Sequence, residues 1–303
     1  MDKQEEFSTI IDTLEIKTGI NNINYTDMEE IQEDNRVIKK PRLNSDSNIL
    51  IPLSFNRAKG RYGRLESLKE LKQDMEDYLM QILGVEVMED IKLNRIDIAV
   101  DSDLDFQDNF KYLLYMYSLI LHSDKYANSW TTISHKDYKP NTLHSKSTQM
   151  DIVFYDKNNE SQGKAPYNTR MEFRAKNLST MDFTKHIDRI IDRIKEMDIN
   201  IPMLNRVTID KICILYDEEL ESADILSFNE FVRKYNHLIF NREILEGLYN
   251  HANMKGNLTN WIKKFRSHKN KLGTQTKLEL FTKTDVTNYQ KECIKSLKKY
   301  KNN

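Results

Sequence analysis

The sequence contains few of the features that mark secreted or membrane proteins. Its 303 residues include two cysteines, Cys213 and Cys293, which form no CxxC pair, so a disulfide framework and a cysteine-ligated zinc site are excluded. No apolar run is long enough to cross a bilayer, and the charged segment Met1–Glu6 does not resemble a signal peptide. We therefore expect a cytoplasmic protein that does not enter a membrane.

The sequence also lacks several common catalytic signatures. It contains no GxxxxGKS/T, GxGxxG or HExxH motif, so nothing indicates bound ATP, a dinucleotide or catalytic zinc. The seven histidines include no His-hydrophobe-His pair, which marks one class of metal-dependent DNA nickases. His135, His144 and His186 are scattered, and we interpret them as surface or capping residues.

Charge is distributed unevenly, although the net charge is only −1. Residues 1–35 contain ten Asp and Glu against two Lys, a net of −8, and residues 255–303 contain thirteen Lys and Arg against three Asp and Glu, a net of +10. A basic segment of this kind predicts a polyanionic partner, and we favour nucleic acid over a lysine-rich solvated helix face. The candidate phosphate contacts are Arg57, Lys59, Arg61, Lys263, Lys264, Arg266, Lys269 and Lys271.

Hydrophobic periodicity predicts an α+β fold with a mostly antiparallel sheet and helices on one face. The predicted strands span 8–16, 48–55, 94–101, 128–134, 150–157 and 170–174. The predicted helices between them span about 65–82, 106–121 and 179–197. We expect a first domain of residues 1–200, with a loop or insertion at 17–47, and a mainly helical, basic region of residues 201–303 for DNA binding or dimerisation.

Three of these strands, Asn94–Asp101, Met150–Lys157 and Tyr167–Arg174, alternate apolar and polar side chains. Successive side chains of a strand point to opposite faces, so each strand has one apolar face for a core and one polar face. The polar faces carry Asp97, Asp101, Tyr155, Lys157, Arg170, Glu172 and Arg174. If the strands lie side by side, these residues form a candidate metal site beside a candidate nucleophile.

These polar residues suit chemistry on a phosphate. Asp97 and Glu172 offer the hard oxygen ligands that Mg²⁺ or Mn²⁺ prefers, and the Tyr155 oxygen can attack phosphorus. Asp101 lies about 13 Å from Asp97 along a strand, at a rise of about 3.3 Å per residue, so we expect it to support the site or to cap the next helix. Phosphate charge would be neutralised by Lys157, Arg170 and Arg174. The alternative is a surface ladder of cross-strand ion pairs around a packed tyrosine.

Read in order, the stretches RIDIAVDSDLDFQDNF, MDIVFYDKNNE and YNTRMEFRAKNL resemble the replication initiators of small rolling-circle plasmids from low-GC Gram-positive bacteria. The similarity is to the Rep_trans family, of the staphylococcal tetracycline-plasmid type. It covers about residues 48–180, and the Lys-rich segment Asp285–Lys301 is similar in kind. The family's aromatic-Gly-x-Arg segment is replaced here by Leu143-His-Ser-Lys146.

The resemblance implies a metal-dependent enzyme that nicks one strand at the plasmid's double-strand origin and later rejoins it. Tyr155 would be the nucleophile and form a 5′-phosphotyrosyl link, with Tyr138 and Tyr167 as the alternatives. The metal, Mg²⁺ or Mn²⁺, would be bound by Asp97 and Glu172. The supporting residues would be Asp101 at the metal, and Lys157 and Arg170 at the phosphate.

The resemblance also implies partners. We expect double-stranded origin DNA, single-stranded DNA, a second copy of the chain and a host helicase. Two other functions compete with replication initiation. One is a conjugative relaxase of a mobile element, and the other is a non-catalytic, origin-binding regulatory protein.

Overall fold

The computed structural model divides the chain into two compact units. The first unit holds the described residues of Met1–Asn109, Lys125–Ile194 and Lys291–Asn303, and the second holds those of Lys195–Gln290. The residues that the structure describes are 7–19, 31–60, 63–83, 91–106, 130–136, 139–146, 148–268, 278 and 280–303.

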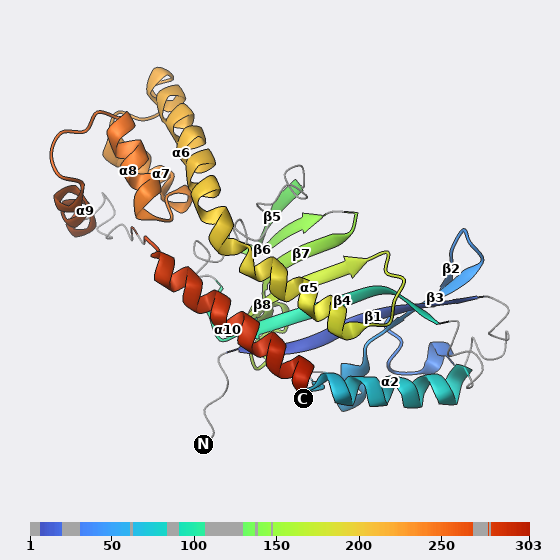
Figure 1. Cartoon of the computed structure of the whole chain (residues 1–303). Helices are drawn as coiled ribbons and strands as arrows, with labels where there is room; N and C mark the ends of the chain where they lie inside the picture. The colour runs from blue at the N-terminus through green and yellow to red at the C-terminus, as the bar shows by residue number, and fades with distance from the viewer. Residues whose placement is uncertain are drawn as a thin grey trace. The chain divides into compact units, whose positions relative to one another are not determined.

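An eight-stranded antiparallel sheet is the centre of the first unit (Figure 1). Its strands lie in the order β2-β3-β1-β4-β8-β7-β6-β5. Their bounds are β1 Phe7–Gly19, β2 Arg42–Leu43, β3 Asn48–Leu53, β4 Lys92–Ser102, β5 Trp130–Lys136, β6 Lys139–Lys146, β7 Met150–Asp156 and β8 Thr169–Lys176. The three strands with predicted polar faces are therefore neighbours, and the α+β prediction is confirmed.

One face of this sheet is apolar and carries the core. Figure 1 shows helix α5, Phe183–Lys195, and helix α10, Lys283–Asn302, crossing it. In α10, the Ser296 hydroxyl lies 2.7 Å from that of Thr9 in β1. The fully or almost fully buried side chains of this layer are Ile96, Ile98 and Val100 of β4, Met171 and Phe173 of β8, Ile187, Ile190, Ile191 and Ile194 of α5, and Cys293 and Leu297 of α10.

Short elements beside β1 shape the other side of the unit. The 3-10 helix η2, Phe55–Lys59, is followed by α2, Leu68–Leu83, and the Phe55 and Tyr78 rings meet edge to face with centroids 5.7 Å apart. After β7, the helix α4, Lys157–Glu160, begins at Asp156, whose carboxylate accepts a hydrogen bond from the Asn159 backbone N–H. These elements bring loop residues to the polar face of the sheet, which is the face opposite α5 and α10.

The second unit is helical in its described residues. Helix α6, Met197–Glu221, is followed by α7, Phe228–Lys234, η5, Asn236–Leu238, α8, Arg242–His251, and α9, Leu258–Ser267. A Cβ atom on Gly247 of α8 would lie 2.8 Å from the Ile209 side chain of α6, so glycine permits the close approach of these helices. The core is an aromatic cluster of Tyr216, Phe228, Phe231, Tyr249, Trp261 and Phe265. No described helix has the length and apolar content to cross a membrane.

The structure differs from the sequence prediction in several elements. Residues 139–146 form strand β6, where we predicted a polar connection. The sequence did not indicate this strand, because Leu143 is the only large apolar residue in the segment and gives no alternating pattern. The segment 17–47 is in part a continuation of β1 and in part β2. Helix α6 begins at Met197 and continues through Pro202, so one helix spans the boundary that we predicted after residue 200. The predicted helix at 106–121 lies almost wholly outside the described residues.

The division between the units also differs from the predicted boundary after residue 200. The central part of the chain belongs to the first unit as far as Ile194. The C-terminal residues Lys291–Asn303 belong to the first unit again. The basic end of α10 therefore belongs to the sheet unit, where its apolar stripe is buried. A helical period alone could not reveal this, because it shows that a helix has an apolar stripe and not what covers the stripe.

Replacing Leu297 by alanine tests that α10 is part of the sheet unit. Leu297 is fully buried, so Leu297→Ala should lower the free energy of unfolding by about 2–5 kcal/mol in urea unfolding. The matched control is Leu226→Ala in the second unit, where the leucine is 83% exposed and the change should stay within about 0.5 kcal/mol. Equal effects of the two substitutions would contradict the packing of α10.

Candidate active site

The polar face of the central strands, opposite α5 and α10, carries a row of buried and partly buried residues. Asp101 of β4 is paired with Arg170 of β8, and Arg170 is paired with Tyr155 of β7. At the two ends of the row, Ser8 of β1 pairs with Asp101 and Thr142 of β6 pairs with Tyr155. Because directly paired residues point to the same face, the predicted nucleophile and two of its predicted helpers lie side by side.

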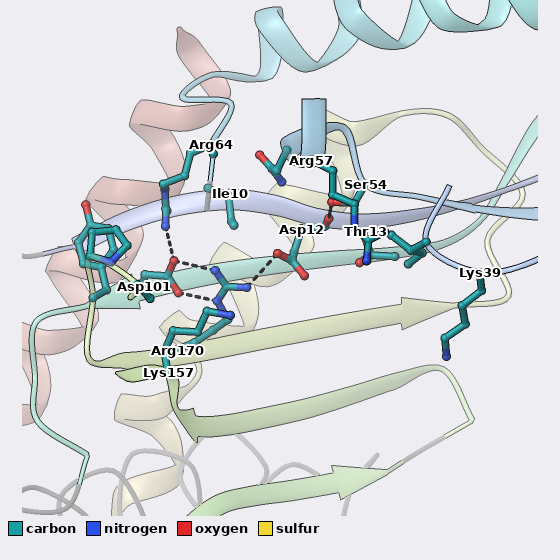
Figure 2. Close-up of a pocket in the computed structure, with 16 residues that line it drawn as sticks. Ile10, Asp12, Thr13, Lys39, Ser54, Arg57, Arg64, Asp101, Lys157 and Arg170 are labelled. Atoms are coloured by element: carbon teal, nitrogen blue, oxygen red, sulfur yellow. Dashed lines mark hydrogen bonds and ion pairs between the residues drawn. The ribbon is translucent and has the colours of Figure 1, made fainter. Parts of the chain in front are cut away.

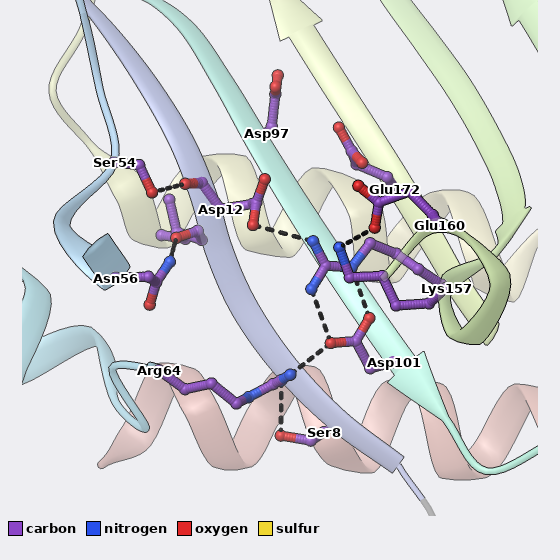
Figure 3. A network of polar contacts seen from close by, with 12 residues as sticks. Ser8, Asp12, Ser54, Asn56, Arg64, Asp97, Asp101, Lys157, Glu160 and Glu172 are labelled. Carbon is purple, nitrogen blue, oxygen red and sulfur yellow. Dashed lines mark hydrogen bonds and ion pairs between the residues drawn. The ribbon is translucent and has the colours of Figure 1, made fainter. Parts of the chain in front are cut away.

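The two predicted metal ligands lie further along the same face, Glu172 two residues and Asp97 four residues along their strands from this row (Figure 3). Asp97 of β4 is paired with Arg174 of β8, and Glu172 is two residues before Arg174, so the carboxylates are diagonal neighbours. Diagonal neighbours of this kind have Cβ atoms about 7 Å apart. Arg95 donates two hydrogen bonds to Asp97, at 2.7 and 2.6 Å, and Arg174 donates one to Glu172 at 2.6 Å.

These two carboxylates are buried together and influence each other. Asp97 is 2% exposed and Glu172 is 3% exposed. Burial raises the pKa of Asp97 to about 6, the hydrogen bond from Arg95 opposes that rise, and the negative charge of Glu172 adds to it. Among the described residues no group of three or more His, Cys, Asp or Glu side chains converges on one point, so the pair stands as two carboxylates.

Tyr155 is half-buried beside Arg170. Burial raises the pKa of Tyr155 well above its ordinary value, and the positive charge of Arg170 opposes that effect. The Lys157 ammonium lies 5.7 Å from the centroid of the Tyr155 ring. The phenol is therefore protonated at neutral pH, and two cations stand next to it that would stabilise an anionic oxygen.

Lys157 lies near Tyr155, but it does so from a helix and not from the strand in which we predicted it. The sequence suggested that Tyr155 and Lys157 share a strand face, but β7 ends at Asp156 and Lys157 is the first residue of α4. The capping carboxylate of Asp156 turns the backbone into the helix, so alternation stops there. Lys157 also donates a hydrogen bond of 2.8 Å to Glu160.

A network of charges fixes Arg170. Its guanidinium donates to Asp101 at 2.6 and 2.9 Å and to Asp12 at 2.9 Å, and Figure 2 shows it between these two carboxylates. Arg64 donates to Asp101 as well, and to the Ser8 hydroxyl at 3.0 Å. Burial alone would raise the pKa of Asp101, but the charges and hydrogen bonds of Arg170 and Arg64 outweigh it and hold the pKa low.

Asp101 thus has a different environment from the one we expected. Its carboxylate is 1% exposed and is occupied by two guanidinium groups, which leaves it an anchor for Arg170 and not a partner of Asp97. The sequence placed Asp97 and Asp101 on one face, which the register confirms, but it did not show that Arg64 would reach Asp101 from the loop before α2.

Asp12 is a site residue that sequence reasoning missed. The pairing of β1 with β4 is interrupted by a bulge between Ile11 and Thr13, so Asp12 and Thr13 both face the site. The backbone groups at the bulge are satisfied from residues beside η2: the Ser54 hydroxyl donates to the Asp12 carbonyl and the Asn56 amide donates to the Ile11 carbonyl, each at 2.7 Å. Alternation from Ser8 onward would have placed Asp12 on this face.

A cavity of about 310 Å³ adjoins the row (Figure 2). Arg170, Asp101 and Lys157 form one part of its wall. The rest is formed by residues of β1, of η2, of the loop before β8, and of the segments 38–39 and 63–64. Gly63 also lines it, and a Cβ atom there would overlap the Lys59 backbone. The lining has five cationic side chains, Lys39, Arg57, Arg64, Lys157 and Arg170, against two carboxylates, Asp12 and Asp101.

The remaining predicted DNA contacts are spread over the chain. Arg57 and Lys59 are exposed on η2, and Lys263 and Lys264 are exposed on α9. Arg266 is used within the second unit, where its guanidinium donates to the Leu278 carbonyl at 3.0 and 2.7 Å. Outside the described residues lie Arg61, Lys269, Lys271 and the alternative nucleophile Tyr138, whereas the other alternative, Tyr167, lines the cavity.

Comparison with known proteins adds a distant structural likeness. No protein-family model and no curated protein matches the sequence. Among solved structures, the chain is similar to a rolling circle replication initiator protein from Geobacillus stearothermophilus, at 13% identity over 82% of this chain and 98% of that chain, with a TM-score of 0.35. At that identity and TM-score, we infer no residue's role from the likeness.

Neutralising Asp101 tests its structural role. Asp101→Asn leaves the buried Arg170 with only the partly exposed carboxylate of Asp12 as a charged partner, and it should lower the free energy of unfolding at pH 7 by about 3–5 kcal/mol in urea unfolding. The control, Asp12→Asn, removes one bond from a carboxylate that is 35% exposed and should cost less than half as much. Because the pKa of Asp101 is lowered on folding, its contribution is present above about pH 4 and is lost as the pH falls further.

Neutralising Asp97 should raise the free energy of unfolding, whereas neutralising Asp101 should lower it. Since the folded pKa of Asp97 is raised, the native state loses stability as the pH rises from about 4 through 6. In EDTA at pH 8, Asp97→Asn should therefore be more stable than the parent by about 2 kcal/mol, and the gain should shrink at pH 5. The exposed control Asp77→Asn should change little at either pH. A loss of stability in Asp97→Asn at pH 8 would contradict this electrostatic picture.

Proposed function

We propose that this chain nicks and rejoins one strand of DNA through Tyr155 and that it initiates rolling-circle replication. The observation that carries the proposal is the row of paired residues on the polar face, in which Tyr155 lies beside the buried Arg170 and diagonal to the buried carboxylate of Glu172. Asp97 is in turn the diagonal neighbour of Glu172 on β4. The resemblance of these same three strands to the Rep_trans initiators agrees with it.

The groups around Tyr155 fit an attack on a phosphodiester. The Tyr155 oxygen loses its proton and forms a bond to phosphorus, while the bond from phosphorus to the 3′ oxygen breaks and that oxygen takes up a proton. The products are a 5′-phosphotyrosyl link and a free 3′-OH, and the reverse reaction rejoins the strand. Arg170 has its guanidinium held by Asp101 and Asp12, so it is positioned to bind a phosphate oxygen without reorganising.

Asp97 and Glu172 are the residues that would hold a divalent cation. Two carboxylates completed by water and substrate phosphate are a usual environment for Mg²⁺, and a cation would relieve the mutual repulsion that burial imposes on this pair. When bound, it would supply charge stabilisation at the phosphate. Arg95 donates hydrogen bonds to Asp97 and Arg174 donates one to Glu172, so the two arginines orient the carboxylates and offset their charge.

The experiment is a nicking assay on a supercoiled plasmid that carries the cognate origin, with Mg²⁺ or Mn²⁺. Tyr155→Phe should reduce relaxation at least a hundredfold and abolish the covalent protein–DNA adduct, because no oxygen remains to attack phosphorus. Tyr78→Phe, which removes a buried hydroxyl without a hydrogen-bond partner in α2, should nick as the parent does.

Three outcomes would contradict the assignment. If nicking persists in Tyr155→Phe but is lost in Tyr138→Phe or Tyr167→Phe, the nucleophile is that other tyrosine and not Tyr155. If nicking is unaffected by both Asp97→Asn and Glu172→Gln, this pair does not bind the cation that nicking requires. Origin binding without nicking in the parent chain would instead favour the non-catalytic DNA regulator.

A further inference from the structure

The cavity beside the row has a surplus of positive charge. Its two carboxylates are already occupied, since Asp101 is bound by Arg170 and Arg64 and Asp12 is bound by Arg170. Within the described ranges, Lys39 and Arg57 line the cavity with exposed side chains and make no ion pair. The charges of these two side chains are therefore available to bind an anionic ligand in the cavity.

Arg64 adds a desolvated donor to the same wall. Its side chain is 11% exposed, and its Nε–H is buried without a hydrogen-bond acceptor. The Glu66 carboxylate lies 3.9 Å from that nitrogen, beyond hydrogen-bond distance. A buried N–H of a charged group that lacks an acceptor costs free energy, and a ligand oxygen in the cavity would recover it.

An aromatic ring completes the lining. Tyr167 belongs to the loop before β8, and the Arg64 guanidinium lies over its ring at 4.9 Å from the centroid. Aromatic rings and guanidinium planes are the surfaces on which unpaired bases stack. Cations for a phosphate and a flat surface for a base therefore occur together in one cavity.

Hydrogen bonds hold the part of the wall that carries Arg64. The Asn56 side chain donates to the Ile11 carbonyl at 2.7 Å and accepts from the Leu65 N–H at 2.8 Å, so it ties β1 to the segment that carries Arg64. The volume of about 310 Å³ lies at the lower end of the range for small-ligand sites, about 300–1,000 Å³. A single nucleotide matches a site of this size better than a longer segment does.

The cavity shares two residues with the surroundings of Tyr155. Arg170 is paired with Tyr155 across the sheet, the Lys157 ammonium lies over its ring, and both residues line the cavity. We propose that the cavity binds one nucleotide of the single strand next to the scissile phosphate, with its phosphate at Lys39, Arg57 and Arg64 and its base on Tyr167. This inference rests on the proposed function for the strand that supplies the nucleotide.

The test measures binding of the full chain to a short fluorescent oligothymidylate by anisotropy, in EDTA. The double variant Lys39→Ala/Arg57→Ala should bind at least tenfold more weakly. The slope of log K against log salt should fall by about 0.7, since the variant loses the contact to one phosphate and each phosphate contact on a single strand contributes about 0.7. Lys69→Ala/Lys185→Ala is the matched control, because it removes two exposed lysines from α2 and α5. It should bind within twofold of the parent.

Tyr167→Ala separates base stacking from charge. It should weaken oligothymidylate binding about tenfold with an unchanged salt slope, because a stacked ring contributes no counterion release. Thermal unfolding of each variant checks that the fold is kept. Binding equal to the parent in both the Lys39/Arg57 and the Tyr167 variants, or an equal loss in the control, would overturn the inference.

Competition with thymidine 5′-monophosphate distinguishes the source of the nucleotide. Displacement of the oligonucleotide only at concentrations at least a hundredfold higher supports a nucleotide within a strand. If the free nucleotide binds as tightly as the oligonucleotide and the cavity variants lose both, the cavity serves a free nucleotide and the strand assignment is wrong. Since EDTA removes nicking from the measurement, failure of Tyr155 as a nucleophile would leave this result unaffected.

Discussion

The polar face of the sheet depends on the buried ion pair between Arg170 and Asp101. It joins β8 to β4 at a place where a loop residue, Arg64, and a bulge residue, Asp12, also meet the strands. Taking such charges out of water is unfavourable, and only well-formed hydrogen bonds to every partner offset that cost. The pair therefore specifies the register of the strands, because a shift of one residue would leave each charge buried alone.

The same face holds a second polar group with the opposite character. Asp101 is compensated by two guanidinium groups and its proton is held less tightly than usual, whereas Asp97 is buried close to another carboxylate and holds its proton more tightly. Two aspartates four residues apart on one strand thus have pKa values shifted in opposite directions, because the charges that surround them differ.

Much of this could be predicted from the sequence, for a physical reason. Alternation fixes which side chains of a strand share a face, so Asp97, Asp101, Arg170 and Glu172 were placed on the correct side before their strands were known to be neighbours. Alternation does not indicate where a strand ends. Lys157 was therefore predicted in a strand, although it is the first residue of the helix that Asp156 caps. It also cannot see contacts across long separations, such as Arg64 on Asp101 or Asp12 on Arg170.

The division of the chain has a consequence for how the protein is made. The sheet unit is interrupted by Lys195–Gln290, and its layer of helices is complete only with the buried residues of Lys291–Asn303. During synthesis the helical unit is therefore finished while the apolar face of the sheet still lacks α10, and domains generally fold as units in the order in which they emerge. A ribosome that stalls before residue 291 would release a chain whose polar site has all its residues but whose core is open. Such a chain would expose the apolar residues that α10 covers in the complete protein, and exposed apolar surface of this kind favours aggregation.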